Sequence, residues 1–337
     1  MPELASQPLE RTAVGRGAPT RGAGIASVAM CVPDRVVANA EITERLEIDA
    51  NWIAKRTGVR ERRIAWPEER LSAFATEAAD IALEHADLPA VELDLVLVAT
   101  MSPDELTPNT APLVAAELGA TRAGAMDVGA ACTGFLSALS LATAQIESRR
   151  AENVLVVGAD LLSRLTDPDD RSTAGLLADG AGAAVVRAED SPGRIGPVVL
   201  GADGAHSALI TASHAERLLH MRGHDTFKHA VARMSQATLQ ALALSERTID
   251  EVDLFVYHQA NSRIIRAVGV ELGLPEERTV DYLAGYGNTS AATIPMALTL
   301  AEEEGRLHRG AVVLLSAFGA GLAWGATVVE WGGDGNG

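Results

Sequence analysis

The strongest constraint on the fold of this chain is an internal repeat. The segment ADLPAVELDLVLVAT at 86–100 is similar to ALSERTIDEVDLFVYHQ at 243–259, and the segment at 115–142 is similar to the one at 269–301. The two copies remain offset by about 155 residues, as in a chain that contains the same supersecondary unit twice. We therefore predict duplicated βα units related by a pseudo-twofold axis.

Within each half, short apolar runs alternate with segments of helical periodicity. This alternation predicts an α/β fold with mostly central strands. The Gly-rich stretch ADGAGAA lacks the third glycine of a dinucleotide-binding loop, and we expect it to be a turn that leads into a strand. The expected strands are 93–100, 153–160, 183–186, 252–258 and 311–319, and the expected helices are 76–86, 134–149, 227–242 and 293–304.

Charge and composition exclude several classes of function. The formal net charge of −17 argues against a nucleic-acid partner and against binding to an anionic membrane. Two uncharged stretches, 283–301 and 311–329, are long enough to be considered as membrane spans. The first contains Gly, Asn and Pro and the second several Gly, so we expect both to be buried core. We expect the second to form a strand, a turn and a strand. Two cysteines, Cys31 and Cys132, give no disulfide framework and suit a reducing, cytoplasmic location.

The repeat places three chemically active side chains at related positions. Cys132 lies in DVGAACTGFLSAL, where an apolar strand turns into a helix, and Asn288 occupies the corresponding junction of the second half. His258 ends a strand of that half, so the fold would bring a thiol, an imidazole and an amide together. Taken alone, Cys132 is a small buried thiol and His258 a core histidine. Taken together, they predict a nucleophile whose pKa is lowered by a helix N-terminus.

We therefore divide the chain into three parts. Residues 1–22 are polar, rich in Pro, Gly and Arg, and lack the apolar region of a signal peptide, so we expect a flexible tail. Residues 23–190 form the N-terminal half with the nucleophile. Residues 191–337 form the C-terminal half with the imidazole and the amide. A papain-like protease also combines Cys, His and Asn, but its arrangement fits symmetric halves poorly.

Several motifs resemble those of a known enzyme family. DVGAACTGF, YHQANSRII, YGNTSAATIP and FGAGLAWGA are similar to the active-site motifs of β-ketoacyl-ACP synthase III, the initiating condensing enzyme of fatty acid and some polyketide pathways. NWIAKRTGVRERRIA, DPDDRST and LADGAGAAVV also resemble that family, and the resemblance runs from about Gly24 to Glu330. It implies a thiolase-like fold with a layered αβαβα core and a homodimer.

The resemblance also implies roles for the three side chains. Cys132 would take an acyl group from acyl-CoA, and His258 and Asn288 would bind the thioester oxygen of malonyl-ACP (ACP, acyl carrier protein) and stabilise the enolate that forms as CO2 leaves. Backbone N–H groups of Cys132 and Ala320 would form the oxyanion hole. No cofactor beyond these substrates and no metal is implied.

Binding residues follow from the same resemblance. Trp52 and Arg171 would sandwich the CoA adenine. Three further residues would contact the CoA phosphate and pantetheine or the carrier protein: Arg56, Asn261 and Arg263.

Three residues would line the acyl pocket: Thr107, Leu177 and Phe318. Thr107 would reach the pocket across the dimer. Because a bulky Phe is common at that position in the family, Thr107 predicts an acyl chain longer or more branched than acetyl.

Other features depart from the family pattern. Tyr257 precedes His258 where Pro is usual, and Val270–Glu271 stands where some relatives carry a Lys pair. Carrier docking would then depend on three other basic side chains: Arg263, Arg266 and Lys228.

Two further functions and one further site remain alternatives. A thiolase-fold acyltransferase would move the acyl group to another acceptor without losing CO2, and a non-enzymatic scaffold would lack the nucleophile that this chain has at Cys132. Five histidines lie between 206 and 229, and His220 and His224 have the i, i+4 spacing of a helical metal site. No Cys or carboxylate pattern completes such a site. We expect a loop over the active site there.

Overall fold

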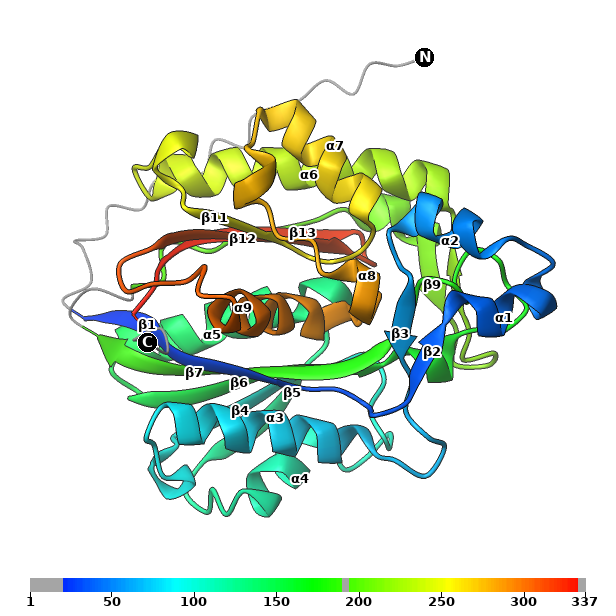
Figure 1. The fold of residues 1–337 in the computed structure, drawn as a ribbon. Coiled ribbons are helices and arrows are strands. Elements are labelled where there is room, and N and C mark those ends of the chain that lie inside the picture. Colours follow the sequence, from blue (N-terminus) through cyan, green and yellow to red (C-terminus); the bar gives the residue numbers. More distant parts are fainter. Residues whose placement is uncertain (1–20, 190–193, 333–337) are drawn as a thin grey trace.

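The computed structural model describes residues 21–189 and 194–332. Helices and sheets alternate in α, β, α, β, α layers (Figure 1). This arrangement confirms the predicted layered α/β core. Most of the expected flexible tail, residues 1–20, lies outside the described residues, and the first strand already begins at Gly22. The boundary expected between residues 190 and 191 also lies outside them.

One sheet belongs to the first half of the chain. Its strand β4 runs parallel to β5 and β6, whereas β7 is antiparallel to both β6 and β1. The strand order across the sheet is β1 (Gly22–Cys31), β7 (Asp179–Glu189), β6 (Asn153–Leu161), β4 (Leu95–Ala99) and β5 (Gly124–Val128).

The second sheet repeats this pattern with equivalent strands. β11 is parallel to β12, and β13 is antiparallel to both β12 and β8. A parallel bridge between Phe255 and Thr279 occupies the place that β5 has in the first sheet. The predicted duplication is therefore visible in the order and direction of the strands: β8 (Val199–Ala202), β13 (Ala323–Glu330), β12 (Val312–Gly319) and β11 (Leu254–Tyr257).

Helices cover both faces of each sheet. The central helices α5 (Gly134–Glu147) and α9 (Thr293–Glu303) lie between the sheets (Figure 1). They are apolar on nearly all sides, as expected of helices that are buried over most of their surface. The outer faces carry α3 (Leu71–His85) and α4 (Thr110–Glu117) on the first sheet, and α6 (Gly223–Leu244) and α7 (Ser262–Leu272) on the second.

Shorter elements complete the chain. They are β2 (Val36–Ala38), α1 (Asn39–Leu46), α2 (Ala50–Thr57), β3 (Glu61–Arg63), β9 (Ile210–Ala212), β10 (Leu219–Met221) and α8 (Leu283–Tyr286). The 3₁₀ turns are η1 (Ala90–Glu92), η2 (Ala131–Thr133), η3 (Leu162–Leu165), η4 (Gly204–Leu209), η5 (Ile249–Glu251), η6 (Glu276–Arg278) and η7 (Ser290–Ala292).

The aspartates that revealed the repeat have equivalent structural roles. The Asp94 carboxylate accepts hydrogen bonds from the backbone N–H groups of Glu152 and Asn153, at the start of β6. The Asp253 carboxylate accepts one from Val312 N–H, at the start of β12. Each side chain therefore fixes the start of the neighbouring parallel strand, which explains why the same residue type recurs.

A second pair of matched aspartates anchors helices. The Asp127 carboxylate accepts hydrogen bonds from the N–H groups of Thr110 and Ala111, in the first turn of α4. The Asp281 carboxylate accepts one from the Ser262 hydroxyl, at the first residue of α7. Unpaired N–H groups and the helix dipole favour a carboxylate at such a position.

The expected strands and helices are present, but they begin and end at different residues. The strand, turn and strand predicted at 311–329 are β12 and β13. Helix α3 begins at Leu71 rather than near residue 76, because the distant carboxylate of Asp104 accepts the N–H groups of Leu71 and Ser72. A cap supplied from another part of the chain leaves no local sequence signal.

One local prediction was wrong, and the alternative of a helical metal site loses its basis. The Gly-rich stretch expected to be a turn is part of β7, where a Cβ on Gly182 would lie 2.9 Å from Pro295, so glycine is needed for the close approach of α9. His220 lies in β10 and His224 in α6, so they do not share a helical face. Within residues 21–189 and 194–332, no helix is long and apolar enough to cross a membrane.

Candidate active site

Cys132 lies in the turn η2, directly before the buried helix α5. The preceding residue, Ala131, has a φ of 45°, in the left-handed region that non-glycine residues seldom adopt. In the second half, Ser290 has a φ of 52° at the start of η7, directly before α9. The two strand-to-helix junctions correspond as predicted, but the residue that matches Cys132 in this geometry is Ala291 rather than Asn288.

The two turns contact each other between the sheets, and glycines make room for them. A Cβ on Gly319, in β12, would lie 2.7 Å from the Cys132 Cβ. A Cβ on Gly158, in β6, would lie 2.3 Å from the carbonyl oxygen of Ala291. Each half of the chain therefore supplies a glycine in a strand, and the turn of the other half packs against that glycine.

His258 follows β11 and is almost fully buried. Its N–H donates to the carbonyl of Ser316 at 2.7 Å, and its Nδ1 lies 2.6 Å from the Thr293 hydroxyl oxygen. That hydroxyl also lies 3.0 Å from the Ser290 carbonyl, which already accepts the Thr293 N–H. The hydroxyl has one hydrogen. It either donates to this carbonyl and accepts from Nδ1–H, or donates to Nδ1 and leaves the ring hydrogen on Nε2.

The charge state of His258 follows from its surroundings. Burial lowers the pKa of its imidazole to about 3, because a charged ring would lose its hydration. The imidazole is therefore neutral near pH 7. Among the residues that the structure describes, none forms a hydrogen bond with Nε2, so this nitrogen of the neutral ring is left for the substrate.

Asn288 is held in place by its own backbone. Its N–H donates to the carbonyl of Leu176, and its carbonyl accepts from Ala178 N–H, both at 2.9 Å. Its Oδ1 accepts the N–H of Ser290 at 2.9 Å, which fixes the orientation of the amide. The Nδ2 group has no acceptor within the described parts of the chain, so the side chain presents N–H donors.

Ser290 links the three predicted residues to one another, although the sequence analysis did not identify it. Its N–H binds Asn288, its carbonyl binds Thr293 beside His258, and its hydroxyl donates to the Cys132 sulfur at 3.5 Å. Its only signal in the sequence is its place in the motif YGNTSAATIP, which resembles an active-site motif. The partial positive charge of the α5 N-terminus and this hydroxyl both face the nucleophile.

The predicted lowering of the nucleophile's pKa was wrong. Cys132 is only partly exposed, and loss of hydration on burial raises the pKa of its thiol to about 11. The hydrogen bond from Ser290 lowers that pKa, and the negative charge of Asp160 raises it further, so burial decides the outcome. The thiol is therefore protonated near pH 7, and its proton must leave as the sulfur attacks.

The predicted oxyanion-hole and pocket residues differ in where they lie. Ala320 follows Gly319, which packs against Cys132, so its backbone lies beside the nucleophile turn. Leu177, from the first half, and Phe318, from the second, are buried in one apolar cluster. Thr107 is exposed in the single chain.

The predicted adenine sandwich is not formed in this structure. The Arg56 guanidinium, rather than that of Arg171, lies 4.9 Å from the centre of the Trp52 ring. Arg171 instead pairs with Glu47 at 3.3 Å. All of these side chains lie on or beside α1 and α2, so the role of Trp52 and Arg171 towards CoA stays a prediction.

Asn261 and Arg263 link that region to α7. The Asn261 side chain caps α7 by accepting the N–H of Arg263 at 2.9 Å, and it donates to the Arg56 carbonyl at 3.1 Å. The Arg263 guanidinium lies 5.9 Å from the centre of the Phe227 ring. Asn261 is therefore a helix cap that joins α2 to α7, a role that its sequence motif did not indicate.

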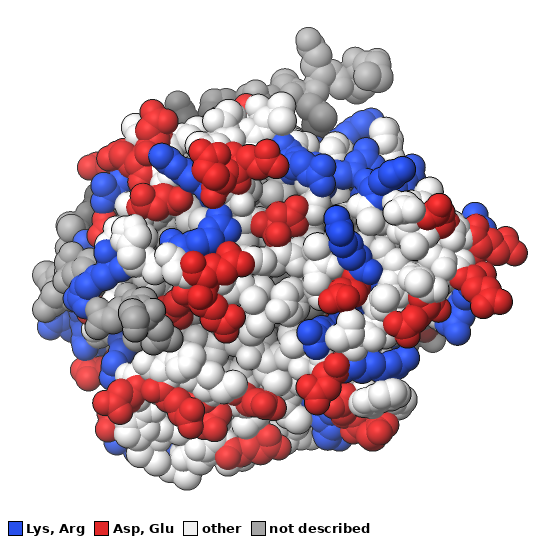
Figure 2. Space-filling model, in the orientation of Figure 1, with Lys and Arg blue, Asp and Glu red and all other residues white. Residues whose placement is uncertain are grey.

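Exposed basic side chains gather where α2, α6 and α7 meet. Figure 2 shows Lys and Arg at the upper right of the molecule, over this region, on a surface that otherwise carries much negative charge. The exposed basic residues of these helices include Lys55, Arg56, Lys228, Arg263 and Arg266. We call them the basic patch.

Within the described chain, no group of three or more His, Cys, Asp or Glu side chains is placed to hold a metal ion.

Comparison with known proteins identifies the family. The model of 3-oxoacyl-[acyl-carrier-protein (ACP)] synthase III matches residues 126–221, and the model of its C-terminal part matches residues 229–331. A β-ketoacyl-[acyl-carrier-protein] synthase III of Roseiflexus sp. (strain RS-1) is 41% identical over 316 residues, covering 90% of this chain and 96% of that protein.

Solved structures agree with this assignment. The 3-oxoacyl-[acyl-carrier-protein] synthase III of Aquifex aeolicus VF5 has a TM-score of 0.90 at 40% identity, covering 92% of this chain and 100% of the other. The priming β-ketosynthase of the R1128 polyketide pathway has a TM-score of 0.90 at 37% identity, covering 96% and 100%. This chain therefore belongs to the 3-oxoacyl-[acyl-carrier-protein] synthase III family of acyltransferases, which have the thiolase fold.

Proposed function

We propose that this protein catalyses an initiating decarboxylative Claisen condensation between an acyl-CoA starter and malonyl-ACP, through an acyl-Cys132 intermediate. The observation that carries the proposal is the connection of Cys132, His258 and Asn288 through Ser290 and Thr293. A nucleophile with two neutral hydrogen-bond donors beside it suits a reaction that forms first an acyl-enzyme and then an enolate.

In the first half-reaction, the Cys132 sulfur attacks the thioester carbonyl of acyl-CoA. Backbone N–H groups of Cys132 and Ala320 stabilise the negative oxygen of the tetrahedral intermediate. The carbon–sulfur bond to CoA then breaks, and the proton that Cys132 loses ends on the CoA sulfur. The high pKa of the thiol in the free protein makes this proton transfer part of the attack, because little thiolate exists beforehand.

In the second half-reaction, the malonyl carboxylate leaves as CO2 and its electron pair forms an enolate. The enolate oxygen accepts hydrogen bonds from His258 Nε2–H and Asn288 Nδ2–H, and both donors are neutral, so neither protonates it fully. The enolate carbon attacks the Cys132 thioester, and the bond to sulfur breaks. Cys132 then takes up a proton from solvent, and the β-ketoacyl carrier leaves.

The basic patch supports acidic, phosphate-bearing substrates. CoA and the phosphopantetheine of a carrier protein are anionic, and the chain as a whole is acidic, so a local group of cations is needed to guide them. Arg56, Asn261 and Arg263 lie in or beside this patch. We assign them to CoA and carrier binding, with Trp52 and Arg171 at the adenine.

We also propose that two chains form a cytoplasmic homodimer in which each Thr107 reaches the acyl pocket of the other chain. Thr107 and Leu106 are exposed in a single chain, and Leu177 and Phe318 form a buried apolar wall to which they could be added. A threonine in place of a bulky ring leaves room for a starter longer or more branched than acetyl. Thr107→Phe should then shift the preference towards acetyl-CoA, and an unchanged preference would contradict this.

One experiment tests the reaction itself. The purified protein is mixed with a panel of acyl-CoAs and then with malonyl-ACP, and the acyl group is followed by intact-protein mass spectrometry. Transfer from the enzyme to a β-ketoacyl carrier supports condensation, and the acyl-CoA that loads best identifies the starter. Loading without extension would favour the alternative acyltransferase. Absence of loading would contradict both.

Two variants serve as matched controls for that experiment. Cys132→Ala should load no acyl group. Asn288→Asp should still load, because the substituted side chain lies on the enolate side of the mechanism. It should extend the acyl group far more slowly, by about a hundredfold, because a carboxylate repels the enolate oxygen that the amide would bind.

A further inference from the structure

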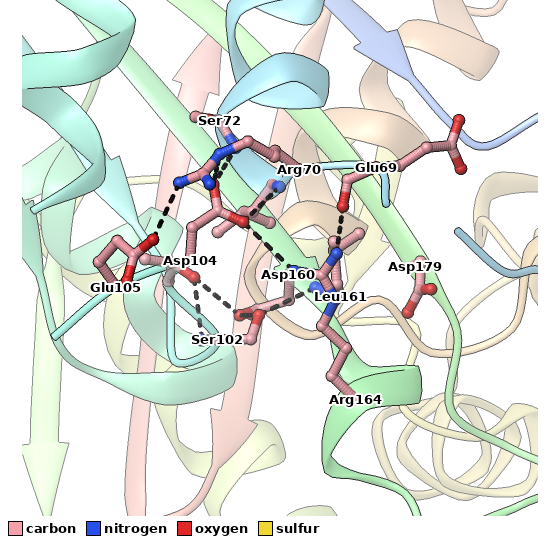
Figure 3. Close-up of polar contacts among 12 residues, drawn as sticks. Glu69, Arg70, Ser72, Ser102, Asp104, Glu105, Asp160, Leu161, Arg164 and Asp179 are labelled. Atoms are coloured by element: carbon pink, nitrogen blue, oxygen red, sulfur yellow. Dashed lines mark hydrogen bonds and ion pairs between the residues drawn. The ribbon is translucent and has the colours of Figure 1, made fainter. Parts of the chain in front are cut away.

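Asp160 is a fully buried carboxyl group near the end of β6. Its Oδ1 accepts hydrogen bonds from the Thr100 hydroxyl at 3.0 Å, the Met101 N–H at 2.8 Å and the Ser102 hydroxyl at 2.8 Å. Figure 3 shows it near Ser102 and the Asp104 group, with no dashed line from Asp160 to Arg70 or Arg164. Within residues 21–189 and 194–332, no Lys, Arg or His pairs with this carboxyl group.

The other oxygen of Asp160 faces the turn η7. Its Oδ2 lies 3.3 Å from the backbone nitrogen of Ala291, which accordingly donates to it. Gly158, two residues earlier in the same strand, leaves the space into which this turn fits. The carboxyl group therefore links the residues that follow β4 to the turn that begins with Ser290. Asp160 and Ala291 are 131 residues apart in the sequence.

Ser290 is completely buried in an unfavourable backbone conformation. Its hydroxyl lies near two sulfur atoms and also forms a hydrogen bond with the Asp160 carboxyl group. Its oxygen lies 3.5 Å from the Cys132 Sγ and 3.8 Å from the Met101 Sδ. A hydroxyl carries one hydrogen, for which the Asp160 carboxyl group and the sulfur atoms compete. A thiolate is a far better acceptor than a neutral thiol or a thioether. As Cys132 loses its proton, this hydroxyl is thus in position to donate to the sulfur.

We propose that Ser290 and Asp160 are a positioning pair for the nucleophile, in which Asp160 holds the turn through Ala291 and Ser290 donates a hydrogen bond to the Cys132 sulfur as its proton leaves. The proposal rests on the proposed function, in which that sulfur attacks acyl-CoA. It adds two residues to which the sequence analysis assigned no role. Neither residue reacts with substrate itself.

Charge and hydrogen bonding make opposite predictions for Asp160, which allows a decisive test. Burial raises the pKa of Asp160, and any negative charge that it keeps raises the pKa of Cys132. The other titratable group near the nucleophile is His258, connected through Thr293 and neutral. If Asp160 acted through its charge alone, removing that charge would make Cys132 more reactive. If it positions Ser290, removing the contact makes Cys132 less reactive.

The first measurement is alkylation of Cys132 by iodoacetamide between pH 6 and 10, resolved by peptide mass spectrometry. Ser290→Ala should alkylate about tenfold more slowly than wild type at each pH below the thiol pKa, because one hydrogen bond to the developing thiolate is lost. Ser290→Gly should behave alike, although it relieves the backbone strain. Equal rates in wild type and Ser290→Ala would overturn the proposal.

Thr299→Ala is a matched control. Thr299 is buried on α9, and its hydroxyl donates only to the carbonyl of Pro295, away from the nucleophile. Its loss should leave the alkylation rate of Cys132 unchanged. Cys31 is an internal control for folding, because global unfolding would accelerate both cysteines. A slowing in Thr299→Ala as large as in Ser290→Ala would overturn the proposal.

The second measurement uses Asp160→Asn. The amide oxygen of the asparagine can still accept the three hydrogen bonds from the residues that follow β4. The amide NH2 group would face the Ala291 N–H, and two donors cannot form a hydrogen bond. Alkylation of Cys132 should slow several-fold, and Asp160→Asn with Ser290→Ala together should be no slower than Ser290→Ala alone. Faster alkylation of Cys132 with unchanged Cys31 would mean that charge dominates and would overturn the proposal.

Failure of this inference can be told apart from failure of the proposed function. Alkylation needs no acyl-CoA, so the comparison holds even if the wild type condenses nothing. Where condensation occurs, Ser290→Ala should lower kcat about tenfold and leave the KM for acyl-CoA nearly unchanged. A rise in KM with kcat preserved would assign Ser290 to substrate binding and would overturn its positioning role.

Discussion

At the scale of single residues, the contact between Thr293 and His258 bears on which ring nitrogen carries the hydrogen. The Thr293 hydroxyl lies 2.6 Å from Nδ1, and the ring is buried and neutral. A neutral imidazole has two tautomers, and only the one with hydrogen on Nε2 can donate to an enolate oxygen. The proposed mechanism therefore requires the Thr293 hydroxyl to donate to Nδ1 rather than to the Ser290 carbonyl.

Thr293→Val should therefore slow condensation. Valine has nearly the same shape but no hydroxyl, so the donor to Nδ1 is lost at a cost of about 1 kcal/mol, which corresponds to roughly a five- to tenfold lower kcat. Thr293→Ser keeps the hydroxyl and should restore most of the activity. Steady-state assays of both variants with malonyl-ACP check this, and equal activity of the valine and serine variants would refute it.

The pH dependence of Cys132 follows from its burial. With a thiol pKa raised to about 11, the thiolate fraction of the free protein rises about tenfold per pH unit throughout the neutral range. Alkylation of Cys132 without substrate should therefore keep increasing to at least pH 9. A rate that levels off below pH 8 would instead show a thiolate stabilised by the helix N-terminus, as the sequence alone suggested.

At the scale of elements, glycines within strands allow buried turns and helices to approach the sheets. Gly319 and Gly158 lie in equivalent strands and each faces the turn of the opposite half. Gly182 does the same for α9. A glycine in a strand usually weakens the strand, so these positions are explained by what packs against them.

Gly158→Ala should destabilise the fold by about 1–3 kcal/mol, because the added methyl group overlaps the backbone of Ala291. Gly319→Ala should do the same and should also slow acyl loading, because it presses on Cys132. Gly269→Ala is the matched control: Gly269 lies in α7 with open space around it, so this change should be neutral or slightly stabilising. Urea denaturation monitored by circular dichroism would measure all three.

At the scale of the whole molecule, the edge strand β5 supports association. It lies at the end of its sheet, and its sequence GAMDV holds neither proline nor a basic residue that would block pairing. The one charged side chain, Asp127, is engaged by α4, while the Met126 side chain is 48% exposed. A second copy of the same strand would cover this edge symmetrically.

Met126→Lys should therefore shift the proposed dimer to monomer, because a lysine buried at the interface would lose its hydration. Leu239→Lys is a matched control, since Leu239 is similarly exposed, at 50%, on the outer helix α6. Light scattering after size-exclusion chromatography measures the mass. A wild type that remains monomeric at micromolar concentration, or an equal effect of both substitutions, would contradict the assignment of this edge.

The sequence alone determined the features that are written in local patterns. Hydrophobic periodicity located the main strands and helices, and the matched aspartates Asp94 and Asp253 revealed the duplication, because each half needs the same anchor at the start of a strand. The motifs around Cys132, His258 and Asn288 identified the family. Such signals depend on residues that are close along the chain, so they can be recognised without coordinates.

Tertiary structure alone decided how those residues act. Ser290 and Cys132 are 158 residues apart and meet because two turns pack between the sheets, and Asp160 joins the same centre from another strand. Burial, rather than the helix N-terminus, sets the protonation of the nucleophile. Contacts between distant residues and the hydration lost on folding depend on where every layer lies, and no short stretch of sequence contains that information.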